Sequence, residues 1–266
     1  MDFSTPKVMG ILNLTPDSFY DGGKFQDKKE MLQQVETMLS EGASIIDVGA
    51  FSSRPSASLI SMEEERSRLQ PALISIMKEF PSAILSVDTY RSEIAKLAIN
   101  EGASIINDIS GGKFDSKMFE TIAQLKVPYI MMHMQGKPKT MQHKPTYEDV
   151  FKEVFYFFTE QLKKLNQLGV NDVILDVGFG FGKTLNHNYE LLRKLKHFHP
   201  LNCPVLVGLS RKGMIQKVIE STAAESLNAT TAAHVIALQN GANLLRVHDV
   251  KAAKEAVEIV DFYQKH

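Results

Sequence analysis

The sequence predicts a single (β/α)8 barrel of the TIM-barrel class, in which eight parallel strands close into a ring inside a layer of helices. Three observations support this prediction. Short, almost continuously apolar runs occur eight times, stretches with a helical period separate them, and no Gly- or Pro-rich linker divides the chain. A length of 266 residues, with 44% hydrophobic and 23% charged side chains, is typical of one large α/β domain. We therefore expect one barrel domain over residues 1–266.

The predicted strands are apolar over nearly their whole length, as expected of parallel strands whose outer face is covered by helices. In chain order they lie within 7–14, 44–50, 83–89, 104–110, 128–134, 172–178, 204–210 and 244–249. The clearest helix falls between the fifth and sixth runs, over 147–165. Its apolar residues recur at steps of three and four: Tyr147, Phe151, Val154, Phe155, Phe158, Leu162 and Leu165. This spacing indicates a helix with one face packed on the sheet.

Three related segments indicate that one β/α unit is repeated. "EGASIIDVGA" at 41–50 returns as "EGASIINDIS" at 101–110 and, more faintly, as "NGANLLRVHD" at 240–249. Each segment places a glycine where a helix is expected to end, as a left-handed cap requires, and then begins a strand. The segments do not recur at a fixed period, so a solenoid is not favoured.

Charge and cysteine content exclude several classes of function. A formal net charge of −1 gives no electrostatic reason to expect binding to nucleic acid or to acidic membrane surfaces. The start of the chain, "MDFSTPKVMG", lacks the apolar core of a signal peptide, and no apolar stretch approaches the ~20 residues that span a bilayer. Cys203 is the only cysteine, which fits a reducing compartment. We expect a soluble cytoplasmic protein.

Polar side chains lie at the C-terminal end of every predicted strand, or just inside it. They are Asn13, Asp47, Asp88, Asn107, His133, Asp176, Ser210 and His248. In a barrel these strand ends open onto one shared face, so we expect the side chains to converge. Because a buried carboxylate is costly unless a partner or ligand satisfies it, the pattern predicts an active site at this face.

Cationic side chains are expected at the same face. They are Arg54, Arg211, Lys212, Arg246 and His248. Arginine donates paired hydrogen bonds to phosphate oxygens, so such a cluster suits an anionic ligand. Carboxylates and amides inside the mouth with cations at its rim predict a ligand with two parts, a polar heterocycle and an outward phosphate.

The segment "DVGFGFGKT" at 176–184 is similar to a nucleotide-binding loop but fails both common patterns. The P-loop G-x-x-x-x-G-K-[ST] requires glycine where Val177 stands, and the dinucleotide pattern G-x-G-x-x-G requires glycine where Lys183 stands. The glycines therefore serve another purpose, which we expect to be tight backbone geometry beside a ligand.

Eight motifs together resemble the dihydropteroate synthase family, in its order and over essentially the whole chain. They read "GILNLTPDSFYDGGKF", "SSRP", "SVDTYRSE", "IINDISGG", "MHMQGKPKTMQ", "DVGFGFGKT", "GLSRK" and "RVHDV". The resemblance implies a pterin-binding TIM barrel that joins 6-hydroxymethyl-7,8-dihydropterin pyrophosphate to p-aminobenzoate and releases pyrophosphate with Mg2+. It also implies a homodimer formed through the late helices, and inhibition by sulfonamides.

The resemblance further implies a role for individual residues. Those expected to bind the pterin are Asp88, Asn107, Met132, Asp176 and Lys212. Those expected to bind pyrophosphate are Asn13, which is also the Mg2+ ligand, Arg54, Arg246 and His248. Those expected near p-aminobenzoate are Ser53, Arg54, Phe179, Ser210 and Lys212. The residues expected to act in catalysis are Asp88, Lys212, Arg246 and His248, in a dissociative, SN1-like step in which the bond to pyrophosphate breaks before the amine attacks.

The chain departs from the family pattern at five positions. Phe51, Ser53 and Ser56 replace Glu, Thr and Gly in the second loop, Val177 replaces a proline, and Gly213 stands where serine is common. These changes gather around the expected p-aminobenzoate site, so they leave susceptibility to sulfonamides open.

Two other functions remain possible at this stage. The methyltetrahydrofolate-binding domain of a corrinoid methyltransferase would share Asp88, Asn107 and Asp176, but would not need the Asn13 loop or the anion-binding cations. A non-catalytic pterin-binding protein derived from the enzyme would bind the pterin without turnover. The retained leaving-group residues favour the synthase.

Overall fold

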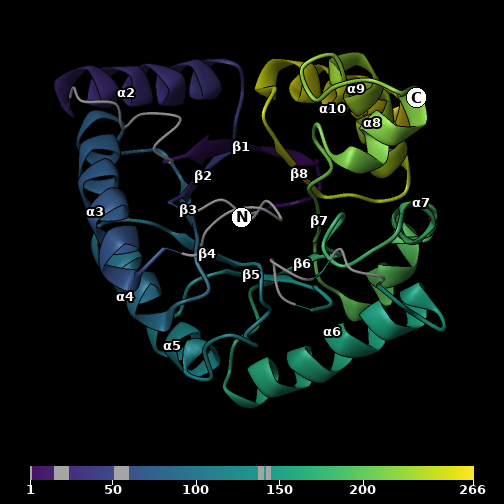
Figure 1. Ribbon diagram of the computed structural model, residues 1–266, viewed down its shortest axis with the longest axis horizontal. Coiled ribbons are helices and arrows are strands. Elements are labelled where there is room, and N and C mark those ends of the chain that lie inside the picture. Colours follow the sequence, from purple (N-terminus) through teal and green to yellow (C-terminus); the bar gives the residue numbers. More distant parts are fainter. Residues whose placement is uncertain (1, 15–23, 51–59, 137–140, 142–144) are drawn as a thin grey trace.

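The chain folds as a closed parallel barrel in which the strands follow one another in sequence order, as predicted (Figure 1). The computed structural model describes residues 2–14, 24–50, 60–136, 141 and 145–266. The strands are β1 (Lys7–Asn13), β2 (Ile45–Gly49), β3 (Leu85–Asp88), β4 (Ile105–Asp108), β5 (Tyr129–Met132), β6 (Val173–Asp176), β7 (Val205–Val207) and β8 (Leu244–Val247). Pairing of β1 with both β2 and β8 closes the ring.

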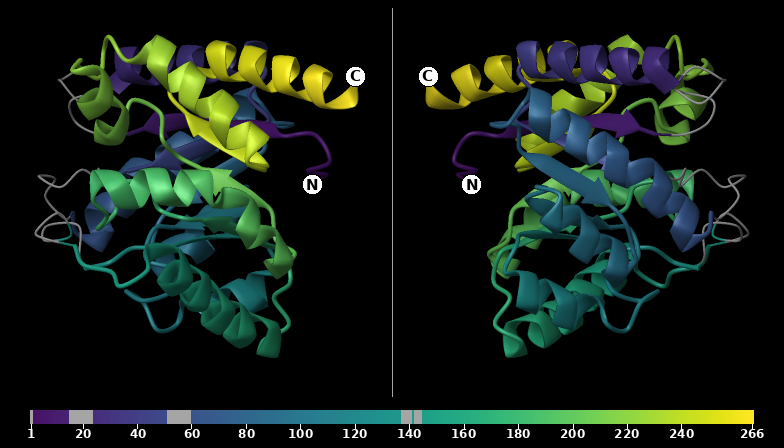
Figure 2. Two further views of the ribbon diagram at one scale, coloured as in Figure 1. Left: turned by 90° about the vertical axis from the view of Figure 1, so that its right-hand side faces the viewer. Right: turned by 90° about the vertical axis from the view of Figure 1, so that its left-hand side faces the viewer.

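The described helices surround the barrel, as Figures 1 and 2 show. They are α2 (Lys24–Ser40), α3 (Met62–Glu79), α4 (Ser92–Asn100), α5 (Met118–Leu125), α6 (Val150–Gln167), α7 (Leu185–Arg193), the 3-10 helix η1 (Leu195–Leu201), α8 (Gly213–Ile219), α9 (Leu227–Gln239) and α10 (Val250–Lys265). None of these helices is both long and apolar enough to cross a lipid bilayer.

Helix α6 begins three residues later than the apolar spacing predicts. Asp149 is its N-cap, because the Asp149 side chain accepts a hydrogen bond from the backbone N–H of Lys152 at 3.0 Å. Tyr147 therefore lies before the helix, where its hydroxyl donates to the carbonyl oxygen of Gly182 at 2.8 Å. The apolar period correctly predicted the helix but could not mark the cap.

The glycines of the three repeated segments end helices, as predicted. Gly42, Gly102 and Gly241 follow α2, α4 and α9 with φ angles of 98°, 97° and 90°. This left-handed conformation favours glycine because it has no Cβ. The repeat therefore marks the point at which each of these helices turns back into the next strand.

The alternation of side chains along each strand separates two apolar cores from one polar layer. The larger core lies between the strands and the helices, and a smaller one fills the barrel with Met9, Ile45, Ile105, Ile130, Ile174, Leu206 and Leu244. Two residues further along the strands, the same inward face carries Asp47, Asn107, Met132, Asp176 and Arg246. The polar layer is thus the direct continuation of the barrel core toward the C-terminal mouth.

Candidate active site

Arg246 joins the acidic side chains of β2 and β3 across the barrel. Its Nε donates to Oδ2 of Asp47 at 2.7 Å, and its Nη2 lies 3.5 Å from Oδ2 of Asp88. Asn107 on β4 donates from Nδ2 to the same Asp47 oxygen at 3.1 Å. Asp47 is fully buried beneath these groups. It therefore orients Arg246 and Asn107 from below, while Asp88 lies nearer the mouth.

Two carboxylate oxygens of this layer accept no hydrogen bond from the described residues. Oδ1 of Asp88 and Oδ1 of Asp47 are buried, and neither has a hydrogen-bond partner among the described residues. Burial raises the pKa of Asp88 to about 8, against the opposing effect of Arg246 and with a further contribution from Asp47. Buried polar atoms are normally satisfied, so an unpaired carboxylate oxygen at a barrel mouth fits a ligand that brings N–H donors.

Asp176 and Lys212 bring a second pair of opposite charges to the mouth. Asp176 accepts a hydrogen bond from the backbone N–H of Gly178 at 2.8 Å, and burial raises its pKa, with Lys212 opposing the rise. The ammonium group of Lys212 donates to the carbonyl oxygen of Phe179 at 2.5 Å and lies 4.6 Å from the ring centre of Phe181. Burial lowers the pKa of Lys212 to about 8.

The predicted cations do not all remain free for a ligand. Arg211 forms two hydrogen bonds with the carboxylate of Asp249, at 2.8 and 2.6 Å, and so is already paired. His248 lies beside Ser210, with its backbone N–H and its Nδ1 at 3.3 and 3.2 Å from the Ser210 hydroxyl oxygen. Of the described residues of this group, Arg246, Lys212 and His248 stand at the mouth, where Arg246 pairs with Asp47 and Asp88 and Lys212 donates to the carbonyl oxygen of Phe179.

His133 does not converge with the other strand-end residues, contrary to the sequence prediction. Because Ile130 and Met132 face inward, the alternation along the strand turns His133 outward. There its Nδ1 lies 3.0 Å from Nζ of Lys183 and its ring packs edge-on against Phe157. Burial and the Lys183 charge hold its pKa well below the usual range.

An apolar patch borders the polar layer at the mouth. It consists of Ile109, Met132, Met134, Met141 and Phe181. Met132, which the family resemblance implies packs against the pterin, belongs to this patch, but the two phenylalanines of the glycine-rich segment differ. The ring of Phe179 is fully buried in the outer core, and only its carbonyl oxygen reaches Lys212. Phe181, which the sequence analysis did not select, is the ring that faces the mouth.

The last two residues of "DVGFGFGKT" have structural partners. The Thr184 side chain caps α7 by accepting a hydrogen bond from the backbone N–H of His187 at 3.2 Å. Lys183 is buried among backbone carbonyl groups. Neither residue supports the nucleotide-binding interpretation, as the register of the motif had indicated.

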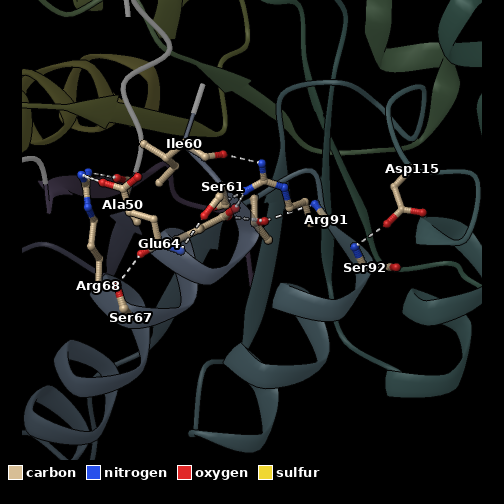
Figure 3. A network of polar contacts seen from close by, with 11 residues as sticks. Ala50, Ile60, Ser61, Glu64, Ser67, Arg68, Arg91, Ser92 and Asp115 are labelled. Atoms are coloured by element: carbon tan, nitrogen blue, oxygen red, sulfur yellow. Dashed lines mark hydrogen bonds and ion pairs between the residues drawn. The ribbon is translucent and has the colours of Figure 1, made fainter. Parts of the chain in front are cut away.

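Two arginines bind the main chain on either side of residues 51–59, as Figure 3 shows. Arg68 on α3 donates to the carbonyl oxygen of Ala50 at 2.9 Å, and Arg91 donates to that of Ile60 at 2.6 Å. Arg91 is held in turn by the fully buried carboxylate of Glu65. That carboxylate also accepts from the hydroxyl of Thr89, the neighbour of Asp88, at 2.7 Å. This network links the Arg91 anchor to the strand that carries Asp88.

Several predicted residues fall outside the described chain. Ser53 and Arg54 lie there, together with the family departures Phe51 and Ser56. Asn13 is described, and it ends β1 with a partly buried side chain.

Comparisons with known proteins show the family of the chain. The family model for pterin binding enzymes matches residues 9–248. The dihydropteroate synthase of Escherichia coli K12 is 45% identical over 263 residues, covering 98% of this chain and 93% of the relative. That of Haemophilus influenzae is 42% identical and covers 97% and 94%.

Solved structures give the same result. The Yersinia pestis dihydropteroate synthase in complex with a sulfonamide drug superposes with a TM-score of 0.93 at 40% identity, over 100% of this chain and 97% of the other. The Xanthomonas albilineans enzyme in complex with 7,8-dihydropteroate superposes with a TM-score of 0.89 at 33% identity, over 100% and 96%. The chain therefore belongs to the dihydropteroate synthase family of pterin-binding enzymes.

Proposed function

We propose that the protein joins 6-hydroxymethyl-7,8-dihydropterin pyrophosphate to p-aminobenzoate, giving 7,8-dihydropteroate and pyrophosphate in folate biosynthesis. The observation that carries this proposal is the pairing, at one mouth, of two buried carboxylates, each with one oxygen that has no donor among the described residues, with cations that suit an anion. Asp88, Asn107 and Asp176 would bind the donors and acceptors at the edge of the pterin ring. Met132 would pack against its flat face.

The leaving group would lie further out. Arg246, His248 and Arg54 would bind the pyrophosphate, since guanidinium groups match phosphate oxygens. Mg2+ binds proteins through one or two oxygen ligands together with substrate phosphates. The oxygen of Asn13 suits that mode, and the described residues contain no cluster of three acidic or histidine side chains that would form a separate metal cage. When bound, the ion would neutralise charge on the departing pyrophosphate.

The second substrate would lie between the pterin and the solvent. Lys212, Ser210, Ser53 and Arg54 would contact p-aminobenzoate or its sulfonamide mimics. We assign the aromatic contact to the ring of Phe181, because the ring of Phe179 is buried in the outer core.

The chemistry would be dissociative. The bond between the methylene carbon and the pyrophosphate oxygen breaks first, its electron pair leaves with pyrophosphate, and the cation is delocalised into the pterin ring. The carboxylate of Asp88 would stabilise that cation, while Arg246 and His248 stabilise the departing anion. The arylamine nitrogen then attacks the carbon and loses a proton. A strong base is not required, because the lone pair of an arylamine is already free.

The test is pyrophosphate release with the dihydropterin pyrophosphate, p-aminobenzoate and Mg2+, each omitted in turn. Full release should require all three, and Lys212→Ala should lower kcat/KM by ~100-fold or more, the loss typical of one charged donor at a reacting site. Pterin binding without release would identify a non-catalytic binding protein. Binding of methyltetrahydrofolate without release would favour the corrinoid methyltransferase alternative.

We also propose that the protein acts in the cytoplasm as a homodimer. The late helices expose large apolar side chains on their outer surfaces: Val218, Ile219, Leu227, Ile236, Ile259, Phe262 and Tyr263. On α10 the last three are 69%, 66% and 71% exposed. Apolar patches of this kind mark association surfaces, and the family resemblance points to the same helices.

A further inference from the structure

Lys183 carries a buried ammonium group that the proposed chemistry does not use. Only 3% of the residue is exposed. Its Nζ lies 3.0 Å from Nδ1 of His133 and donates to the carbonyl oxygens of Gly178 at 3.0 Å and Phe181 at 3.2 Å. The carbonyl oxygen of His133 lies 3.3 Å away. An ammonium group has three donors, so these contacts use all of them and leave none for a substrate phosphate.

These contacts join two segments that lie directly against each other. Gly178 and Gly182 have positive φ angles of 70° and 63°. A Cβ atom on Gly178 would come within 1.9 Å of the His133 carbonyl oxygen, and one on Gly182 within 2.3 Å of that of Gln135. The glycine-rich loop 178–182 therefore packs on the chain that leaves β5. Lys183 binds carbonyl groups of both segments and so fastens one to the other.

The fastened loop holds three groups of the candidate site. The backbone N–H of Gly178 orients the carboxylate of Asp176, and the carbonyl oxygen of Phe179 receives the Lys212 ammonium group. The ring of Phe181 lies beneath that ammonium group. Gly178 is thus bound on one side by Lys183 and on the other by Asp176, which makes a path of two hydrogen bonds from the buried lysine to the site.

We propose that Lys183 is a positioning residue that holds loop 178–182 and thereby sets the orientation of Asp176 and Lys212 before the pterin binds. Burying a lysine away from water is costly unless its donors are satisfied. Here they are satisfied by backbone groups of the loop and of the segment after β5. The assignment of a pterin ligand rests on the proposed function, whereas the holding of the loop does not.

Lys183→Met tests this inference, because methionine has a similar length and no donor. Lys113→Met is the matched control. Lys113 is an exposed lysine whose ammonium group lies 3.4 Å from the Met134 carbonyl oxygen and 4.3 Å from the ring centre of Phe157, outside the glycine-rich loop. Hydrogen exchange of the unliganded protein is the first measurement. Lys183→Met should speed amide exchange within loop 178–182 by ~10-fold or more, the effect of losing about 1.4 kcal/mol of local protection. Exchange rates in the barrel strands should stay unchanged.

Pterin binding is the second measurement, by calorimetry with 6-hydroxymethylpterin. Lys183→Met should weaken it at least ~10-fold, and Lys113→Met by less than ~2-fold. A uniform rise in exchange over the whole chain would show a general structural role and overturn the inference, as would unchanged exchange in 178–182. Failure of the wild-type protein to bind any pterin would instead count against the proposed function. If Lys183→Met does not fold, Lys183→Gln, which has two N–H donors on a shorter, uncharged side chain, carries the same comparison.

Discussion

Asp88 is a carboxyl group whose surroundings oppose the charge that the proposed mechanism needs. Burial raises its pKa to about 8, and the nearby Asp47 adds to the effect, while Arg246 opposes it. N–H donors of a bound pterin would lie against its unpaired oxygen and favour the ionised form. Binding of the pterin would thus help to release a proton from Asp88, so that its carboxylate is charged when the ring is in place.

This leads to a prediction about stability and pH. The ordinary pKa of an aspartate is 3.8 and that of Asp88 in the fold is about 8, so between these values the folded chain binds a proton that the unfolded chain has lost. The contribution of Asp88 to the free energy of unfolding should therefore fall as the pH rises from about 4 to 8. Asp88→Asn should remove that slope, which corresponds to about one proton per molecule. Denaturant unfolding of both proteins at pH 5 to 8 measures it; parallel curves would show that the proton is elsewhere.

Helix α9 contains a histidine that neither the barrel nor the site employs. His234 is 2% exposed, and neither ring nitrogen has a hydrogen-bond partner in the described part of the chain. Burial lowers its pKa to about 4. One turn earlier on the same helix, the hydroxyl of Thr230 accepts from the backbone N–H of Arg211 at 3.3 Å. The helix thus supports the segment after β7 while it carries an unsatisfied side chain.

Replacing His234 with leucine should stabilise the helix packing. The substitution removes two buried polar atoms without partners, each of which costs on the order of 1–3 kcal/mol, so Tm should rise by several degrees. The pH dependence should change as well. The folded pKa is depressed from 6.5 to about 4, so wild-type stability is lost as the pH falls through that window. Calorimetric melting at pH 7 and pH 5 should show a smaller acid loss in His234→Leu; an equal loss in both proteins would contradict the prediction.

At the scale of the whole molecule, exposed apolar side chains gather on the helices that close the chain. Helix α10 packs on α9 and on strands β1 and β8, so one side of the helix is covered by the barrel and the other side faces outward (Figure 2). Ile259 and Phe262 are three positions apart on that helix and share one face. A second copy of the chain would cover them.

The double variant Ile259→Glu/Phe262→Glu should therefore be a monomer where the wild-type chain is a dimer. Two carboxylates cannot be buried at an apolar interface without partners. Sedimentation equilibrium gives the two masses directly. Tyr156→Glu is the control, since Tyr156 is an equally exposed side chain, 66% accessible, on α6. A monomeric wild type, or dissociation by the control as well, would place the interface elsewhere.

The fold and most of the polar layer were predictable because every second side chain along a strand points to the same face of the sheet. The apolar runs located all eight strands. The polar residues at their ends included Asp88, Asn107 and Asp176, and the cations expected at the same face included Arg246. His133 was misplaced because the same period was not applied to it. Since Met132 faces inward, its neighbour had to face the helices.

Other features depend on geometry that no local pattern records. Which of Phe179 and Phe181 faces the mouth depends on a loop whose glycines have left-handed φ angles. The alternation of side chains seen in strands does not hold in such a loop. The contact between Lys183 and His133 joins residues 50 positions apart, and that between Arg91 and Glu65 joins residues 26 apart. Such contacts exist only once the barrel is closed, and each of these residues would also suit a solvated surface.

The anchors at Ala50 and Ile60 bear on how far the sequence between them can vary. Arg68 and Arg91 bind the main chain at these two residues, so the described part of the barrel is held on both sides of the segment. Once the ends are held, even a doubling of the intervening length costs only ~0.6 kcal/mol of closure entropy. Phe51, Ser53 and Ser56, where the chain departs from the family pattern, lie in sequence between these two anchors. We therefore expect substitutions or insertions there to leave the strand that carries Asp88 unchanged.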